Sequence, residues 1–191
     1  MNKRKMNKTA LILAPGFEEG EALTIVDILR RANLHCDLVG FEKIVEGGHG
    51  IKVQSDLLFS EEIKDYDMII LPGGYEGVQN MVNNVTLINV LKEMNEQGKY
   101  ISAMCAAPVV LEKAGVLENK NFTAYQGYDQ KIKQGNFKED KVVIDKNLIT
   151  SRGPATAYAF AYKLVDILGG DSLAVKKRMV YFNAFDVKED E

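Results

Sequence analysis

Short apolar runs alternate with longer amphipathic segments along this 191-residue chain. The runs at residues 9–14, 66–71 and 99–104 are mostly apolar, as expected for strands that are buried on both faces of a sheet. A segment with helical spacing of apolar residues follows each run, for example at residues 20–32. This alternation predicts an α/β fold in which helices cover both faces of a mostly parallel sheet.

The remaining elements fit the same architecture. Further strands are predicted at 35–41 and 120–124, hairpins at 43–54 and 141–150, and helices at 77–97 (broken near Asn83-Asn84), 108–114, 153–168 and 172–180. No linker or repeat divides the chain, so residues 1–191 are predicted to form a single domain. Residues 1–8 and 187–191 are expected to be flexible ends.

Composition excludes several classes of function. Apolar residues make up 46% and charged residues 27%, which is typical of a globular domain. The net charge of -3 gives no broad basic surface for nucleic acid. The apolar run behind the basic N-terminus is too short for a signal peptide or a membrane span, so a cytoplasmic protein without a membrane partner is predicted. Its two cysteines, Cys36 and Cys105, predict free thiols and neither a disulfide framework nor a cysteine-rich metal site.

Cys105 is the principal candidate for chemistry. It stands where the strand at 99–104 runs into the helix at 108–114, with the small residues Ala106 and Ala107 after it. A thiol at a helix N-terminus faces unpaired amides and the positive end of the helix dipole, which predicts a lowered thiol pKa. The layout is that of a nucleophile elbow with cysteine in place of serine, although a buried structural cysteine is the alternative.

Three more loops are expected beside Cys105, because ligands bind at the carboxyl ends of the strands in open α/β sheets. Glu21 either complements the helix dipole from solvent or, if it points into the crevice, acts as a protonated partner of the thiolate and moves protons. Gly73 and Gly74 form either a tight turn or, together with the amide of Ala106, an oxyanion hole. The glycines lack the G-x-G-x-x-G spacing, so no dinucleotide cofactor is predicted.

The loop before the helix at 153–168 contributes Arg152 and Gly153. Arg152 is interpreted either as a surface charge or as a side chain that pins the loops around the sulfur. His35 and His49 lie in segments that offer no base to Cys105, which disfavours ordinary cysteine-protease chemistry. No His, Cys, Asp or Glu cluster has ligand spacing in the sequence, so no metal is predicted.

These residues resemble the motifs of a known family, the ThiJ/PfpI superfamily, on its DJ-one-like branch of parkinsonism-associated deglycases. The matching motifs are LILA-x-GFEE-x-E over residues 11–21, VD-x-LRRA over 26–32, D-x-IILPGG over 67–74, I-x-A-x-CA-x-P over 101–108 and LITSRGP over 148–154. They run in order across nearly the whole chain, and the last three are the most specific.

The resemblance implies a flavodoxin-like three-layer sandwich with a small β-hairpin and a nucleophilic cysteine on a strained elbow. It implies that Glu21 is the protonated partner of Cys105, that Gly73, Gly74 and Ala106 donate amides near the sulfur, and that the protein forms a homodimer. Two positions depart from the family pattern. Tyr125 stands where the pocket histidine is expected, and His49 stands where an interface arginine is expected, although Arg30 and Arg31 are kept as parts of a possible anion site.

Three functions are therefore open. The first is cofactor-independent chemistry of the glyoxalase or deglycase type on small reactive carbonyls or glycated substrates, with Cys105 as nucleophile, Glu21 as proton carrier and Tyr125, Arg152 and Gly153 lining the pocket. The second is a redox-sensing, stress-protective or chaperone-like role through oxidation of Cys105. The third is a peptidase or amidase.

Overall fold

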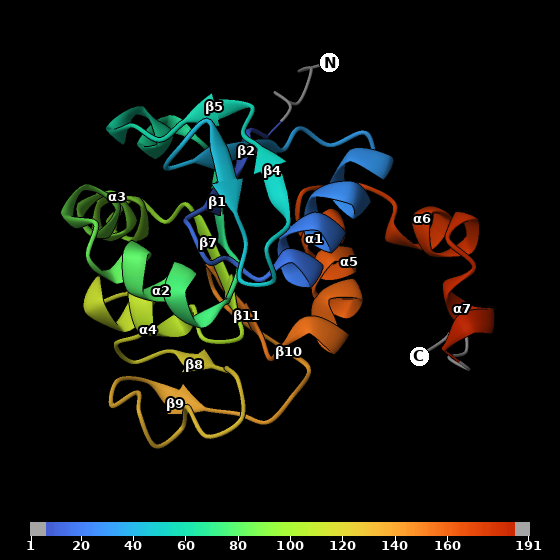
Figure 1. Cartoon of the computed structure of the whole chain (residues 1–191). Coiled ribbons are helices and arrows are strands. Elements are labelled where there is room, and N and C mark those ends of the chain that lie inside the picture. The colour runs from blue at the N-terminus through green and yellow to red at the C-terminus, as the bar shows by residue number, and fades with distance from the viewer. Residues whose placement is uncertain (1–6, 186–191) are drawn as a thin grey trace, which may run out of the picture.

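The computed structural model describes residues 7–185 and shows a sheet between two layers of helices (Figure 1). The sheet has seven strands in the order β10-β11-β7-β6-β1-β2-β5. Neighbouring strands are parallel, except that β10 and β11 form an antiparallel hairpin at one edge. The predicted α/β layers with a mostly parallel sheet are thus confirmed.

The central strands lie where the apolar runs place them. The sheet consists of β1 (Thr9–Leu13), β2 (Asp37–Gly40), β5 (Leu57–Leu58), β6 (Met68–Leu71), β7 (Tyr100–Met104), β10 (Val142–Asp145) and β11 (Leu148–Ser151). Two small ribbons lie outside it, the antiparallel pair β3 (Ile44–Glu46) and β4 (Lys52–Gln54) and the parallel pair β8 (Asn121–Phe122) and β9 (Asn136–Phe137). The sequence did not predict β5 or β9, because two residues are too few to show a period.

The helices agree with the predicted order. They are α1 (Glu19–Arg31), α2 (Tyr75–Val82), α3 (Val85–Glu96), α4 (Pro108–Lys113), α5 (Ala157–Ile167), α6 (Ser172–Arg178) and α7 (Tyr181–Ala184), with single 3₁₀ turns η1 (Glu61–Asp65) and η2 (Pro154–Thr156). The break between α2 and α3 is as predicted, because the Asn84 side chain accepts a hydrogen bond from the Leu87 amide (2.9 Å) and caps the new helix. The long helix expected from residue 153 instead begins as η2. The helix α7 was not predicted and follows Val180 in the left-handed conformation (φ 59°).

Two apolar layers sandwich the sheet. In Figure 1, α1 and α5 cover one face, while α2, α3 and α4 cover the other. Strand β1 shows how the sheet serves both layers, because Ala10 and Ile12 pack into one core and Leu11 and Leu13 into the other. Cys105 packs against both cores at the end of β7.

The predicted convergence of loops at the carboxyl ends of the strands is confirmed by backbone hydrogen bonds. The Glu18 amide donates to the Gly73 carbonyl (2.9 Å), and the Cys105 amide donates to the Ser151 carbonyl (3.1 Å). The first bond joins the loops after β1 and β6, and the second joins the elbow after β7 to the end of β11.

The chain ends are only partly described. Lys8, expected in a flexible end, is instead held at the sheet, because its amide donates to the Asp67 carboxylate (2.8 Å). Residues 1–6 and 187–191, the rest of the expected flexible ends, lie outside the described residues. No helix in the described part of the chain has the length and apolar character needed to cross a bilayer.

Candidate active site

Cys105 occupies a strained turn. Its φ of 59° lies in the left-handed region, which costs a side-chain-bearing residue about 1–2 kcal/mol. Its amide donates to the Ser151 carbonyl (3.1 Å) and its own carbonyl accepts from the Tyr125 amide (2.8 Å). The two bonds hold the cysteine in a conformation that the chain would otherwise avoid, and such held strain is characteristic of functional residues.

Glu21 reaches the same point from the first turn of α1. Its side chain is completely buried, and Oε2 accepts a short hydrogen bond from the Gly73 amide (2.6 Å). The carboxyl group also interacts with the Cys105 thiol. The buried Oε1 of Glu21 has no hydrogen-bond partner.

Burial dominates the ionisation of both groups. It raises the pKa of Glu21 from 4.5 to about 7, against the opposing effects of the Gly73 amide and the Cys105 thiol. Burial also raises the pKa of Cys105, and the negative charge of Glu21 raises it further. The prediction of a lowered thiol pKa was therefore wrong in sign, because it counted the dipole of α4, a helix of only six residues, and left out burial.

One proton shared by the pair has two possible positions. It lies either on sulfur beside a carboxylate or on Glu21 beside a thiolate, and the two forms carry the same net charge. Burial and the charge of Glu21 raise the already higher pKa of Cys105, so the first form is favoured, although the amides of Ala106 and Gly74 oppose this by stabilising the thiolate. The Glu21 carboxylate can then take the thiol proton as sulfur attacks, so no external base is needed.

The glycines keep this corner open. A Cβ on Gly73 would lie 2.6 Å from Cys105 Cβ and 2.7 Å from Glu21 Oε2. Gly74 has a φ of 95°, and a Cβ there would lie 2.3 Å from the Gly16 carbonyl oxygen. Of the three expected amide donors, Gly74 and Ala106 face the sulfur, whereas Gly73 donates to Glu21. Gly73 therefore positions the acid and is not an open oxyanion donor.

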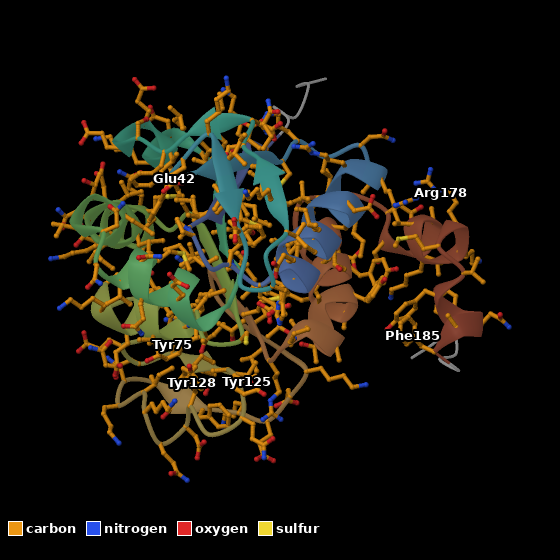
Figure 2. The ribbon with its side chains drawn as sticks, viewed as in Figure 1. Glu42, Tyr75, Tyr125, Tyr128, Arg178 and Phe185 are labelled. Atoms are coloured by element: carbon orange, nitrogen blue, oxygen red, sulfur yellow. The ribbon has the colours of Figure 1, made fainter. Side chains whose placement is uncertain are left out.

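A cavity of about 420 Å³ opens onto the sulfur. Its lining residues are Glu18, Gly74, Tyr75, Cys105, Ala106, Tyr125, Gln126, Tyr128, Lys131 and Pro154. Figure 2 shows Tyr75, Tyr125 and Tyr128 gathered where α2 approaches the loop between β8 and β9. We call this cavity the thiol pocket. Sequence reasoning missed Tyr75, Gln126, Tyr128 and Lys131 as lining residues, because none of them belongs to a motif with a chemical signature. Glu18 lies within the motif over residues 11–21 but was not assigned to the pocket.

Arg152 and Gly153 line an adjoining cavity of about 330 Å³ that shares Tyr125, Gln126 and Pro154 with the thiol pocket. The Arg152 guanidinium donates to the carbonyls of Ala124 (3.3 Å) and Glu139 (3.2 Å). The structure favours the interpretation in which Arg152 holds the loops around the sulfur over that of a surface charge, because these bonds fix the segment that carries Tyr125.

Neither histidine of the chain lines the thiol pocket. His49 instead closes the loop between β3 and β4 onto α1, because its amide and its Nδ1 contact the two carboxylate oxygens of Glu19 (2.7 and 2.9 Å). Burial disfavours the charged form of Glu19, yet the hydrogen bonds from His49 lower its pKa overall. Glu18, Glu19 and His49 bring their ligand atoms within 4.8 Å of one another, a potential cation site that linear spacing did not reveal. The oxygens of Glu19 are, however, already used by the loop.

Arg30, Arg31 and His49, the residues of a possible anion site that the histidine puts in doubt, are each paired with a carboxylate. Arg30 pairs with Asp56 (2.5 Å) and Arg31 with Asp27 (2.7 Å), while His49 pairs with Glu19. Each cation has a carboxylate partner, so no positive charge is left to collect an anion there.

Known proteins share the fold of this chain. The model of the DJ-1/PfpI family matches residues 7–167, which include every loop of the site. The chain belongs to the DJ-1/PfpI family. Within it, the chain is 38% identical to Drosophila melanogaster protein dj-1beta over 171 residues, covering 86% of this chain and 91% of that protein. The crystal structure of DJ-1beta superposes with a TM-score of 0.85, covering 92% of this chain and 98% of the other.

Two further family members carry informative names. Caenorhabditis elegans DJR-1.2, named a glutathione-independent glyoxalase, is 34% identical over 169 residues, which cover 85% of this chain and 90% of that protein. Oxidized DJ-1 from Toxoplasma gondii is 30% identical with a TM-score of 0.85, covering 91% of this chain and 98% of the other. The resemblance seen in the sequence and the flavodoxin-like fold that it implied are thus confirmed.

Proposed function

We propose that this protein is a cofactor-independent enzyme of the glyoxalase or deglycase type, which converts 2-oxoaldehydes such as methylglyoxal to 2-hydroxy acids. The observation that carries the proposal is the strained Cys105 beside a buried Glu21 whose pKa is raised to about 7. A group that must both give and accept a proton works best with a pKa near the working pH. The glyoxalase name of the C. elegans relative supports the same reaction.

The proposed reaction begins when the Glu21 carboxylate takes the proton of the Cys105 thiol and the resulting thiolate attacks the aldehyde carbon. Glu21 gives its proton to the new alkoxide, which yields a hemithioacetal. The Glu21 carboxylate then removes the hydrogen from that carbon and returns a proton to the neighbouring carbon, while the hydroxyl proton passes from the first oxygen to the second, so that a thioester of lactate forms. Water hydrolyses the thioester, and methylglyoxal plus water has become lactate with the thiol regenerated. No electron leaves the substrate overall, so the proposal requires no cofactor.

The test is formation of lactate from methylglyoxal by the purified protein. Glu21→Gln and Cys105→Ala should each lower kcat/KM at least about a hundredfold, because each removes a group that acts directly on the reacting atoms. Cys36→Ala is the matched control, since Cys36 is buried away from the pocket. Full activity of either site variant would contradict the mechanism.

Redox sensing or stress protection is the second candidate, and a specific feature favours it. Oxidation of Cys105 to a sulfinate would place oxygens near the carboxyl group of Glu21 and the amides of Gly74 and Ala106, the groups that interact with the thiol. Mass spectrometry after mild peroxide treatment should find Cys105 oxidised and Cys36 unchanged. Oxidation of Cys36 in preference would count against this role. A peptidase or amidase has less support, because neither histidine lines the thiol pocket.

A homodimer also remains a proposal. The β3–β4 ribbon leaves Ile44 and Ile51 about half exposed, and its loop is bound to α1 through Glu19. Light scattering of the purified protein should give twice the chain mass, and Ile51→Glu should shift it to a single chain mass if this ribbon lies in the interface.

A further inference from the structure

One cation on the wall of the thiol pocket has no carboxylate partner. Lys131 lines the pocket, and its Nζ lies 4.4 Å from the centroid of the Tyr128 ring. Within residues 7–185, no ion pair joins Lys131 to an acidic side chain. Arg30, Arg31 and His49 all have such partners, so Lys131 differs from them in presenting an uncompensated charge at a cavity that holds the nucleophile.

The position of Lys131 relative to the sulfur is fixed by the backbone. The Tyr125 amide donates to the Cys105 carbonyl (2.8 Å), and the Tyr128 amide donates to the Tyr125 carbonyl (3.0 Å). The amides of Lys131 and Ile132 both donate to the Tyr128 carbonyl (3.1 and 2.9 Å). Ile132 is 5% exposed and anchors this turn in the core. A continuous series of hydrogen bonds therefore leads from the elbow to the lysine.

The surroundings of Lys131 prepare it to bind an anion. An ammonium over an aromatic face is attracted to the ring on one side and keeps its other N–H bonds for a ligand. Tyr128 is partly buried, whereas Tyr75, Tyr125 and Lys131 are exposed, so an ion pair formed at this wall stays partly solvated. Glu18 is the other charged group among the lining residues besides the reacting pair, and it repels an anion from its own part of the wall.

We propose that the thiol pocket selects 2-oxoaldehydes that carry a carboxylate a few carbons from the aldehyde, and that Lys131 binds this carboxylate while Cys105 attacks the aldehyde. The inference rests on the proposed function for the reaction itself. Lys131 acts here as a specificity-determining residue, and it takes no part in the proton transfers.

The first experiment needs no turnover. Cys105 is alkylated with iodoacetate and, separately, with iodoacetamide, which transfer a charged or a neutral group to sulfur with loss of iodide. Lys131→Met should lower the ratio of the iodoacetate rate to the iodoacetamide rate about threefold to fivefold, the usual range for one partly exposed ion pair. The iodoacetamide rate itself should stay unchanged, which also shows that the pocket is intact.

Two variants serve as controls. Lys131→Arg keeps the charge and should keep the ratio, while Lys92→Met removes an exposed charge on α3 and should leave the ratio at the wild-type value. Mass spectrometry assigns each adduct to Cys105 or Cys36. An unchanged ratio in Lys131→Met, or an equal fall in Lys92→Met, would overturn the proposal.

The second experiment measures substrate selection. The wild type should convert 4,5-dioxopentanoate to 2-hydroxyglutarate with a KM about fivefold below that for the methyl ester of the same compound. Lys131→Met should raise KM for the acid, leave KM for the ester and leave kcat for both. Equal KM values in the wild type would refute the selection. If the wild type turns over neither compound nor methylglyoxal, the proposed function fails, while the alkylation ratio still decides whether Lys131 attracts anions to the sulfur.

Discussion

Replacing Glu21 with glutamine should remove a large pH dependence from the stability of the fold. Glutamine imitates the protonated acid and can still accept the hydrogen bond from the Gly73 amide. In the wild type, burial raises the pKa of Glu21 from 4.5 to about 7. One pKa unit corresponds to about 1.4 kcal/mol, so a carboxyl group raised this far changes the free energy of unfolding by about 3 kcal/mol between its two protonation limits.

The sign of the effect follows from proton binding. The folded protein holds the Glu21 proton more tightly than the unfolded chain does, so this group stabilises the fold below pH 4.5 relative to higher pH. That stabilisation is lost as pH rises through about 7, where the folded carboxyl group ionises. Glu21→Gln does not ionise and should keep the stability that the wild type loses.

Urea unfolding at several values between about pH 4 and about pH 8 measures this difference. The advantage of Glu21→Gln over the wild type should grow by about 3 kcal/mol across the range. Glu118→Gln, which removes an exposed carboxylate, should show no comparable change. A difference between Glu21→Gln and wild type that stays constant with pH would refute the raised pKa, and with it the role of Glu21 as a proton carrier near neutrality.

Three other outcomes are expected. Gly73→Ala should lower turnover of methylglyoxal about a hundredfold or more, because the added Cβ would lie 2.6 Å from Cys105 Cβ and displace the nucleophile. Lactate assays would measure this loss, and near-normal turnover would contradict the packing argument. Iodoacetamide should label Cys105 and leave Cys36 free in the folded protein, since Cys36 is buried whereas Cys105 lines the thiol pocket; peptide mapping checks this, and equal labelling would disprove it. Tyr125→His should speed alkylation of Cys105 at neutral pH roughly threefold or more, because an imidazolium would stabilise the thiolate; an unchanged rate would show that this side chain lies too far from the sulfur.

The central strands of the sheet can be predicted from the sequence because their apolar runs are long enough to be recognised as strands buried on both faces. The strands β1, β6 and β7 are buried on both faces and contain almost no polar interruption. The ribbon β8–β9 and the strand β5 have two-residue strands, whose pairing depends on neighbours that no local pattern specifies. Helix α7 packs through Tyr181 against Tyr162 of α5, a contact between distant segments that leaves no periodic signal.

The candidate site was predictable in its residues and less so in its electrostatics. The positions of Cys105 and Glu21 follow from motif and topology. The raised thiol pKa does not, because it depends on how completely both groups are buried. Gly73 was assigned to a substrate oxygen because a bare amide was expected there, whereas the three-dimensional arrangement turns that amide toward Glu21. Lys131 lay outside every motif, and only the turn that folds back on Tyr128 brings it to the pocket.

Cys105 touches both apolar layers, one on each side of the sheet. Chemistry at this sulfur therefore has a mechanical consequence as well as a catalytic one. A group that becomes attached to the sulfur, whether an acyl intermediate or added oxygen, occupies the thiol pocket, yet any strain that it places on Cys105 falls on a residue packed against both layers. Covalent modification of this one sulfur can therefore change the stability of the domain. A shift in melting temperature would report whether Cys105 carries an adduct.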